Sequence, residues 1–232
     1  MPLPKIETPT YELTVPSTEE LIEYRPFLVK EEKILLIAQE SGEAKDIIRA
    51  LKQIVSSCTF NKVSPDDLAP YDLEYIFLQL RSKSIGETSE FSVKCEACGE
   101  FNKVEVDLST IEVTFPLNKD ENVIQLTDQI GVVLQPIHLD KIEDIDNTAS
   151  DFTKIIALSI DSIFDSENVY KSTDVSEKEL IEFVESLSRS QVSKIEYFLE
   201  NQPYLSKQVD FVCKSCGTKN TITLKGLDAF FE

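Results

Sequence analysis

Four cysteines occur as two pairs with the same spacing, Cys95 with Cys98 and Cys213 with Cys216. Two intervening residues let both thiolates of a pair point at one ion. A glycine directly follows each pair, and glycine can take the positive φ angle on which such a turn ends. Four thiolates that converge from two turns form the closed tetrahedral set of a structural zinc site. We therefore expect these four residues to be the ligands of one zinc ion.

The two pairs lie within an internal repeat. Shifting residues 93–106 by 118 positions aligns them with residues 211–224, matching both cysteines, the glycine, one asparagine and the alternating apolar positions. Each copy predicts a strand, a CxxCG turn and a second strand. The sequence therefore predicts a zinc ribbon of two hairpins, at 88–112 and 206–226.

Other chemistries remain open for the cysteines. A rubredoxin-like iron ion accepts the same sulfur tetrahedron, and the thiols could also stay without metal. A thioredoxin-like redox pair usually places its first cysteine at a helix N-terminus, whereas these pairs lie between predicted strands. A catalytic zinc is disfavoured, because four sulfur ligands leave no position for water.

No other residues form a recognisable catalytic or cofactor-binding site. His138, the single histidine, has no nucleophile in a recognisable context, which favours a capping or surface role. No glycine-rich loop could cradle a phosphate. An acidic run lacks the spacing of a calcium loop. It consists of Asp140, Glu143, Asp144, Asp146 and Asp151. The fifth cysteine, Cys58, is expected to be a small buried side chain.

Charge and hydropathy exclude further classes. Forty-two acidic and 23 basic residues give a formal net charge of −19, which disfavours nucleic acid as a partner. The longest apolar run, residues 34–38, is too short to cross a membrane, and the first 18 residues do not resemble a signal peptide. We therefore expect a protein of a reducing compartment, in which cysteines bind metal rather than form disulfides.

The remaining pattern predicts an α+β fold, with helical bundle elements, short antiparallel hairpins and a ribbon that joins the first third of the chain to the C-terminus. We expect an extended or hairpin segment at 1–28 and a helical region at 29–87. Residues 113–205 would contain a hairpin at 123–136 and a helix over about 138–165. Two more helices would follow, one after a capping box at Ser176 and one ending before Pro203.

The metal would close a long loop. Because 114 residues separate Cys98 from Cys213, all of 113–205 becomes an excursion between the two halves of the ribbon. A crosslink over such a loop removes several kcal/mol of chain entropy from the unfolded state. This closure favours one integrated domain.

The N-terminal strings LPKIETPTYELTVPST, YRPFLVKEEKILLIAQES and YDLEYIFLQLRSKSIGE resemble the baseplate hub or hub-assembly protein family of T4-like contractile-tailed bacteriophages, over about residues 3–110. The resemblance implies a non-enzymatic hub component whose partners are other hub, spike and tail-tube proteins. It also implies a location in the host cytoplasm during assembly and in the tail baseplate of the virion. It supplies no functional residues to transfer.

Three functions are compatible with the sequence: a subunit retained in the virion, an assembly chaperone that leaves, and a zinc-ribbon nucleic-acid adaptor. The adaptor is disfavoured because acidic side chains surround the first cysteine pair. For the interface, residues 24–27 and the exposed side of a helix at 71–83 are candidates, because their aromatic and arginine side chains are typical anchors. The competing interpretation is that these aromatic side chains pack in the core.

Overall fold

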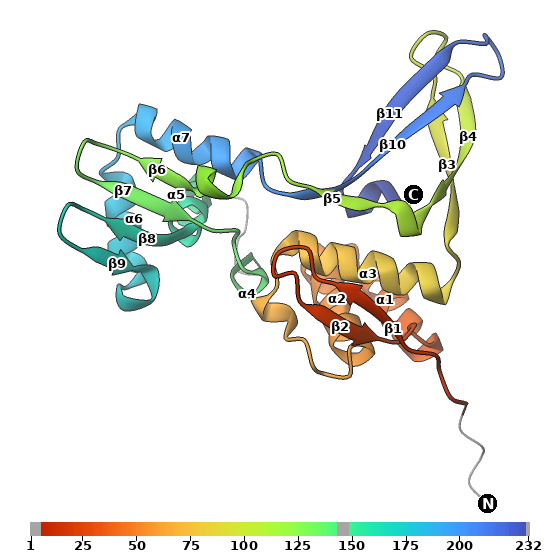
Figure 1. Ribbon diagram of the computed structural model, residues 1–232, viewed down its shortest axis with the longest axis horizontal. Helices are drawn as coiled ribbons and strands as arrows, with labels where there is room; N and C mark the ends of the chain where they lie inside the picture. The colour runs from red at the N-terminus through yellow and green to blue at the C-terminus, as the bar shows by residue number, and fades with distance from the viewer. Residues whose placement is uncertain (1–5, 143–148, 231–232) are drawn as a thin grey trace, which may run out of the picture. The chain divides into compact units, whose positions relative to one another are not determined.

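Two compact units make up the part of the chain that the computed structural model describes, residues 6–142 and 149–230 (Figure 1). Unit 1 comprises residues 1–114 and 204–232, and unit 2 comprises residues 115–203. Unit 2 is thus a continuous insertion between the two segments of unit 1. The bounds of unit 2 lie close to those of the expected excursion at 113–205. That the whole chain forms one integrated domain stays a prediction. The fold class is α+β, as predicted.

Unit 1 begins with an antiparallel hairpin followed by helices, as expected. Alternating apolar side chains place Leu13 and Ile22 inward from the hairpin. A left-handed Gly42, with φ of 70°, ends the first helix, and Pro70 opens the third helix at a position where its missing N–H is not needed. The elements are β1 (Tyr11–Thr14), β2 (Leu21–Tyr24), α1 (Val29–Ser41), α2 (Ala44–Cys58) and α3 (Pro70–Ser84).

Three aromatic residues among the interface candidates at 24–27 and on α3 belong to the core, whereas the exposed side of α3 stays a prediction. Tyr24, Phe27 and Phe77 are 2%, 8% and 1% exposed. The rings of Phe27 and Phe77 stack with centroids 6.3 Å apart. Arg25 is also engaged, because its guanidinium donates to the buried Glu31 carboxylate at 2.9 Å. These side chains hold the hairpin against the helices and are not available to a partner.

The ribbon of unit 1 consists of two long hairpins that lie side by side (Figure 1). Their facing sides carry alternating apolar residues, among them Phe91, Val104 and Phe211, which pack together with Leu78 of α3. The first hairpin is a two-stranded sheet, and a short strand adds to the second to give the order β11-β10-β5. The strands are β3 (Thr88–Lys94), β4 (Phe101–Asp107), β5 (Glu112–Thr114), β10 (Tyr204–Val212) and β11 (Lys219–Lys225).

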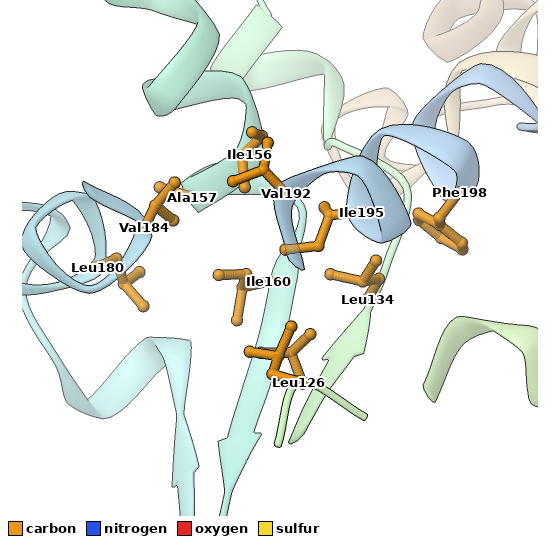
Figure 2. Packing of buried hydrophobic residues seen from close by; sticks show 11 residues of the cluster. Leu126, Leu134, Ile156, Ala157, Ile160, Leu180, Val184, Val192, Ile195 and Phe198 are labelled. Carbon is orange, nitrogen blue, oxygen red and sulfur yellow. The ribbon is translucent and has the colours of Figure 1, made fainter. Parts of the chain in front are cut away.

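Unit 2 is a four-stranded antiparallel sheet, in the order β6-β7-β8-β9, with helices packed against it. Figure 2 shows Leu134 and Ile160 of the sheet pointing toward Ile195 and Ile156 of the helices. The elements are β6 (Val123–Gln125), β7 (Gly131–Leu134), α4 (Leu139–Ile142), α5 (Ala149–Leu158), β8 (Ile160–Phe164), β9 (Val169–Lys171), α6 (Glu177–Glu185) and α7 (Arg189–Glu200). The hairpin at 123–136, the capping box at Ser176 and the last helix are confirmed.

The helix predicted over 138–165 is wrong at its C-terminal end. α5 ends at Leu158, and the following residues form β8, which pairs with β7 and β9. Ile156, Ile160 and Ile163 have helical spacing, yet a short apolar run fits a strand equally well, so periodicity alone cannot separate the two. Residues 160–164 form a strand and not a helix because β7 and β9 pair with them on both sides.

Short 3-10 helices connect several of these elements: η1 (Pro65–Asp67), η2 (Leu108–Thr110), η3 (Lys119–Asn122), η4 (Ser172–Asp174) and η5 (Leu227–Phe230). Among the described residues, every helix is too short or too polar to span a bilayer.

Candidate metal centre

The four predicted cysteine ligands converge at the turns of the two ribbon hairpins. All four sulfur atoms lie within 4.8 Å of one another. The Sγ atoms of Cys95 and Cys216 are 3.8 Å apart, and those of Cys98 and Cys213 are 3.6 Å apart. A tetrahedron with zinc–sulfur bonds of about 2.3 Å has edges of about 3.8 Å. The cluster can therefore bind a metal ion, and its geometry is consistent with zinc.

The two turns have the same backbone hydrogen bonds. In the first turn, the N–H of Cys95 donates to the carbonyl of Glu100 at 2.9 Å, and the N–H of Gly99 donates to the carbonyl of Cys95 at 2.9 Å. The second turn repeats both bonds around Cys213 and Gly217. The two glycines have φ angles of 77° and 74°, where a side chain would be strained. The internal repeat thus folds into two copies of one turn.

Two buried asparagines connect the turns to each other. Oδ1 of Asn102, on β4, accepts the N–H of Lys214 in the opposite turn at 2.9 Å. Oδ1 of Asn220, on β11, accepts the N–H of Glu96 at 3.0 Å. In addition, Nδ2 of Asn102 lies 3.5 Å from the sulfur of Cys213. These asparagines occupy equivalent positions of the internal repeat, and that equivalence is the sequence signal for their role, which spacing alone did not reveal.

Hydrogen-bond donors favour the thiolate form of Cys95 and Cys213. The backbone N–H of Cys216 and the side chain of Asn102 lower the pKa of Cys213 to about 6. The backbone N–H of Cys98 likewise lowers the pKa of Cys95. The N–H of Glu100 lowers the pKa of Cys98. Hydrogen bonds from the Cys98 thiol to the neighbouring sulfur atoms, of which that to Cys216 has the largest effect, outweigh this and raise the pKa of Cys98 to about 12. Without a metal ion, Cys98 therefore keeps its proton. A bound cation would favour the loss of that proton, because a cysteine binds metal as a thiolate.

Four sulfur ligands would saturate a tetrahedral ion. No coordination position is left for water or a substrate, so the centre is suited to a structural role and not to catalysis.

The fifth cysteine is separate from the centre. Cys58 is buried beside Arg25, whose Nη1 lies 3.6 Å from its sulfur, and burial raises the pKa of its thiol to about 11. Its expected role as a small buried side chain is confirmed.

His138 is not one of the residues gathered at this centre. His138 is partly buried just before α4, and its carbonyl accepts the N–H of Lys141, so it lies at the start of that short helix. In the acidic run, Glu143, Asp144 and Asp146 lie outside the described residues. The side chains of Asp140 and Asp151 are not described either.

Comparison with known proteins identifies one family. Residues 8–232 match the family described as T4 bacteriophage base plate protein, which covers nearly the whole chain. Neither a curated protein nor a solved structure matches the chain.

Proposed function

The chain belongs to the T4 bacteriophage base plate protein family, and we propose that it serves the central hub of the baseplate as a non-enzymatic subunit or assembly factor. The family match over residues 8–232 is the observation that carries this function. Baseplate proteins act through contacts with other baseplate proteins, so the proposed partners are hub, spike and tail-tube proteins. The proposed locations are the host cytoplasm during assembly and then the virion tail.

The proposal includes one structural zinc ion held by Cys95, Cys98, Cys213 and Cys216. The sulfur–sulfur distances of 3.6 and 3.8 Å support it, because they are close to the edges of a zinc–thiolate tetrahedron. Iron fits the same geometry, and metal analysis of protein purified under reducing conditions distinguishes the two. Zinc predicts one ion per chain and no visible absorption.

The bound ion would fasten the two chain segments of unit 1 to each other. The ribbon hairpins already share an apolar interface, but their turns meet through only a few hydrogen bonds beside the sulfur atoms. The ion adds four bonds there, and its binding free energy becomes folding free energy. If the ion acts like a covalent crosslink over the 114 residues between Cys98 and Cys213, it increases the free energy of unfolding by about 4–5 kcal/mol. A stable ribbon would present the protein to its partners in one conformation.

A second candidate role is that of an assembly chaperone that leaves before the virion is complete. The net charge of −19 favours it, because an acidic surface can shield the basic surface of an immature partner. Mass spectrometry of purified particles and of assembly intermediates distinguishes the roles. Presence in both indicates a subunit, and presence only in intermediates indicates a chaperone. Absence from both contradicts the proposed hub function.

A nucleic-acid adaptor is the least favoured role. Glu96, Glu100, Glu105 and Asp107 are exposed around the first hairpin, and carboxylates there repel phosphate. A binding titration with single- and double-stranded DNA at low salt tests this directly. Tight binding that weakens steeply with added salt would favour the adaptor role over the hub role.

A further inference from the structure

Helix α1 carries large apolar side chains on the side that faces away from its own core. Its inner side packs against α2 and includes the buried Ala38. On the outer side, Val29 is 79% exposed, Leu36 is 54% exposed and Ile37 is 58% exposed. A single exposed aliphatic residue is ordinary, but a helix that is apolar on both sides is typical of one that is covered on both sides.

These residues form one continuous surface with two charged side chains. At 100° per residue, Val29, Lys33, Leu36, Ile37 and Glu40 all fall on the same half of the helix. We call these five residues the α1 outer face. All five are exposed. Along the helix axis, the positive charge of Lys33 therefore precedes the aliphatic pair Leu36 and Ile37, and the negative charge of Glu40 follows it.

The two charges are placed symmetrically about the aliphatic centre. Lys33 and Glu40 are seven residues apart, about 10 Å along the helix axis, so their side chains are too far apart to pair well within one helix. Within the described part of the chain, neither forms an ion pair. The midpoint between them falls between Leu36 and Ile37, the two central aliphatic residues.

We propose that the α1 outer face binds the same face of a second copy of this chain, with the two helices antiparallel. A twofold axis between Leu36 and Ile37 places Leu36 of each copy opposite Ile37 of the other. The same axis places Lys33 opposite Glu40 of the second copy, and Glu40 opposite Lys33 of the second copy. Such a face is self-complementary in both shape and charge, as an isologous contact requires.

The charge arrangement is what favours a second copy over an unrelated partner. An unrelated apolar partner would require no symmetry between Lys33 and Glu40. A parallel pair of α1 helices would place each charge beside its own kind, which is unfavourable. The pairing requires neither the metal nor the family assignment, so it can fail while the proposed hub function holds.

The contact is expected to be small and reversible. α1 has 13 residues and is therefore about 20 Å long, so one helix pair buries less than the surface of a stable standard interface. Sedimentation equilibrium of the full metal-loaded chain, from about 5 to 500 μM, is the suitable measurement. We expect a monomer–dimer equilibrium within this range. A chain that stays monomeric throughout overturns the proposal and leaves the face to another partner.

Substitution of the aliphatic centre tests the location of the contact. Leu36→Ser and Ile37→Ser should each weaken dimerisation at least tenfold, because each removes two symmetric copies of an apolar side chain. Both side chains are more than half exposed, so the fold should survive, which circular dichroism checks. Ile85→Ser is the matched control, because Ile85 is 62% exposed at the end of α3 and outside the face. Equal weakening by the control would overturn the proposal.

A charge exchange tests the orientation. Lys33→Glu and Glu40→Lys should each weaken dimerisation about tenfold, since each creates two like-charge contacts by symmetry. The double variant K33E/E40K should restore dimerisation to within about threefold of wild type. Restoration requires that the two positions meet between chains. A double variant as weak as the sum of its two single variants would exclude the antiparallel pairing.

Discussion

Asn102 and Asn220 each accept a hydrogen bond from the backbone of the CxxCG turn in the other's hairpin. Oδ1 of Asn102 accepts from Lys214 at 2.9 Å, and Oδ1 of Asn220 accepts from Glu96 at 3.0 Å. The two residues are 4% and 6% exposed. Because the exchange is reciprocal, each hairpin supplies one hydrogen-bond acceptor to the turn of the other. The ribbon is therefore coupled at its tip by protein contacts as well as by the proposed ion.

Replacing either asparagine should destabilise the protein to a similar extent. Asn102→Ala or Asn220→Ala leaves one backbone N–H in the opposite turn without its acceptor, a loss of about 1–3 kcal/mol. Chemical denaturation of the reduced, metal-loaded protein measures the change. Thr223→Ala, at an exposed position on β11 near Asn220, is the control and should change stability little. A large effect at one asparagine and none at the other would contradict the reciprocal arrangement.

Removing one cysteine pair should remove the metal. Cys95→Ser with Cys98→Ser leaves two thiolates, which cannot close a tetrahedron, so metal content should fall from one ion per chain to none. The free energy of unfolding should fall by several kcal/mol. Elemental analysis and thermal melting measure the two effects. Cys58→Ala should keep its metal, and unchanged metal in the double serine variant would refute the ligand assignment.

Asp72 should make stability fall as pH rises. Its side chain is fully buried, one carboxylate oxygen has no hydrogen-bond partner, and burial raises its pKa. A raised pKa in the folded state means that Asp72 favours folding below its unfolded pKa of about 3.9 and loses this contribution as pH rises through the folded value. The variant Asp72→Asn does not titrate and keeps an acceptor for the Ser17 N–H.

The stability of Asp72→Asn relative to wild type should therefore increase between pH 4 and pH 7. Urea denaturation at several pH values gives the difference directly, provided that both proteins keep their metal over the range used. A difference that is constant with pH would show that folding does not shift the pKa of Asp72, and a difference that decreases as pH rises would show that its carboxylate is stabilised in the folded protein. Either result contradicts the prediction.

Gly131 should not tolerate a side chain while Phe164 is present. The two residues are partners on β7 and β8, and a Cβ atom at Gly131 would overlap the Phe164 ring. Gly131→Ala should therefore cost about 1–3 kcal/mol of stability. Phe164→Leu shortens the side chain, so adding it to Gly131→Ala should recover part of the loss in a double-mutant cycle. Strictly additive losses would contradict a direct clash.

The sequence alone determined the features that local spacing encodes. The identity of the four cysteines, their grouping at two equivalent turns, the N-terminal hairpin with its helices and the capping box at Ser176 all followed from residues close together in the chain. A CxxCG turn, a cap and an alternating strand each satisfy their hydrogen bonds or periodicity locally. These predictions therefore did not depend on knowing which distant segment packs beside them.

Only the tertiary structure decided which distant groups meet. The apolar run at Ile160 became a strand because β7 and β9 offered backbone partners, although its spacing fitted a helix. The aromatic residues near Phe27 became core because the hairpin folds onto α3. The exchange between Asn102 and Asn220 needs two hairpins more than a hundred residues apart to face each other. Burial and hydrogen bonding of this kind each require two segments that are distant in sequence. A local pattern describes only one of these segments and does not specify which segment packs against it.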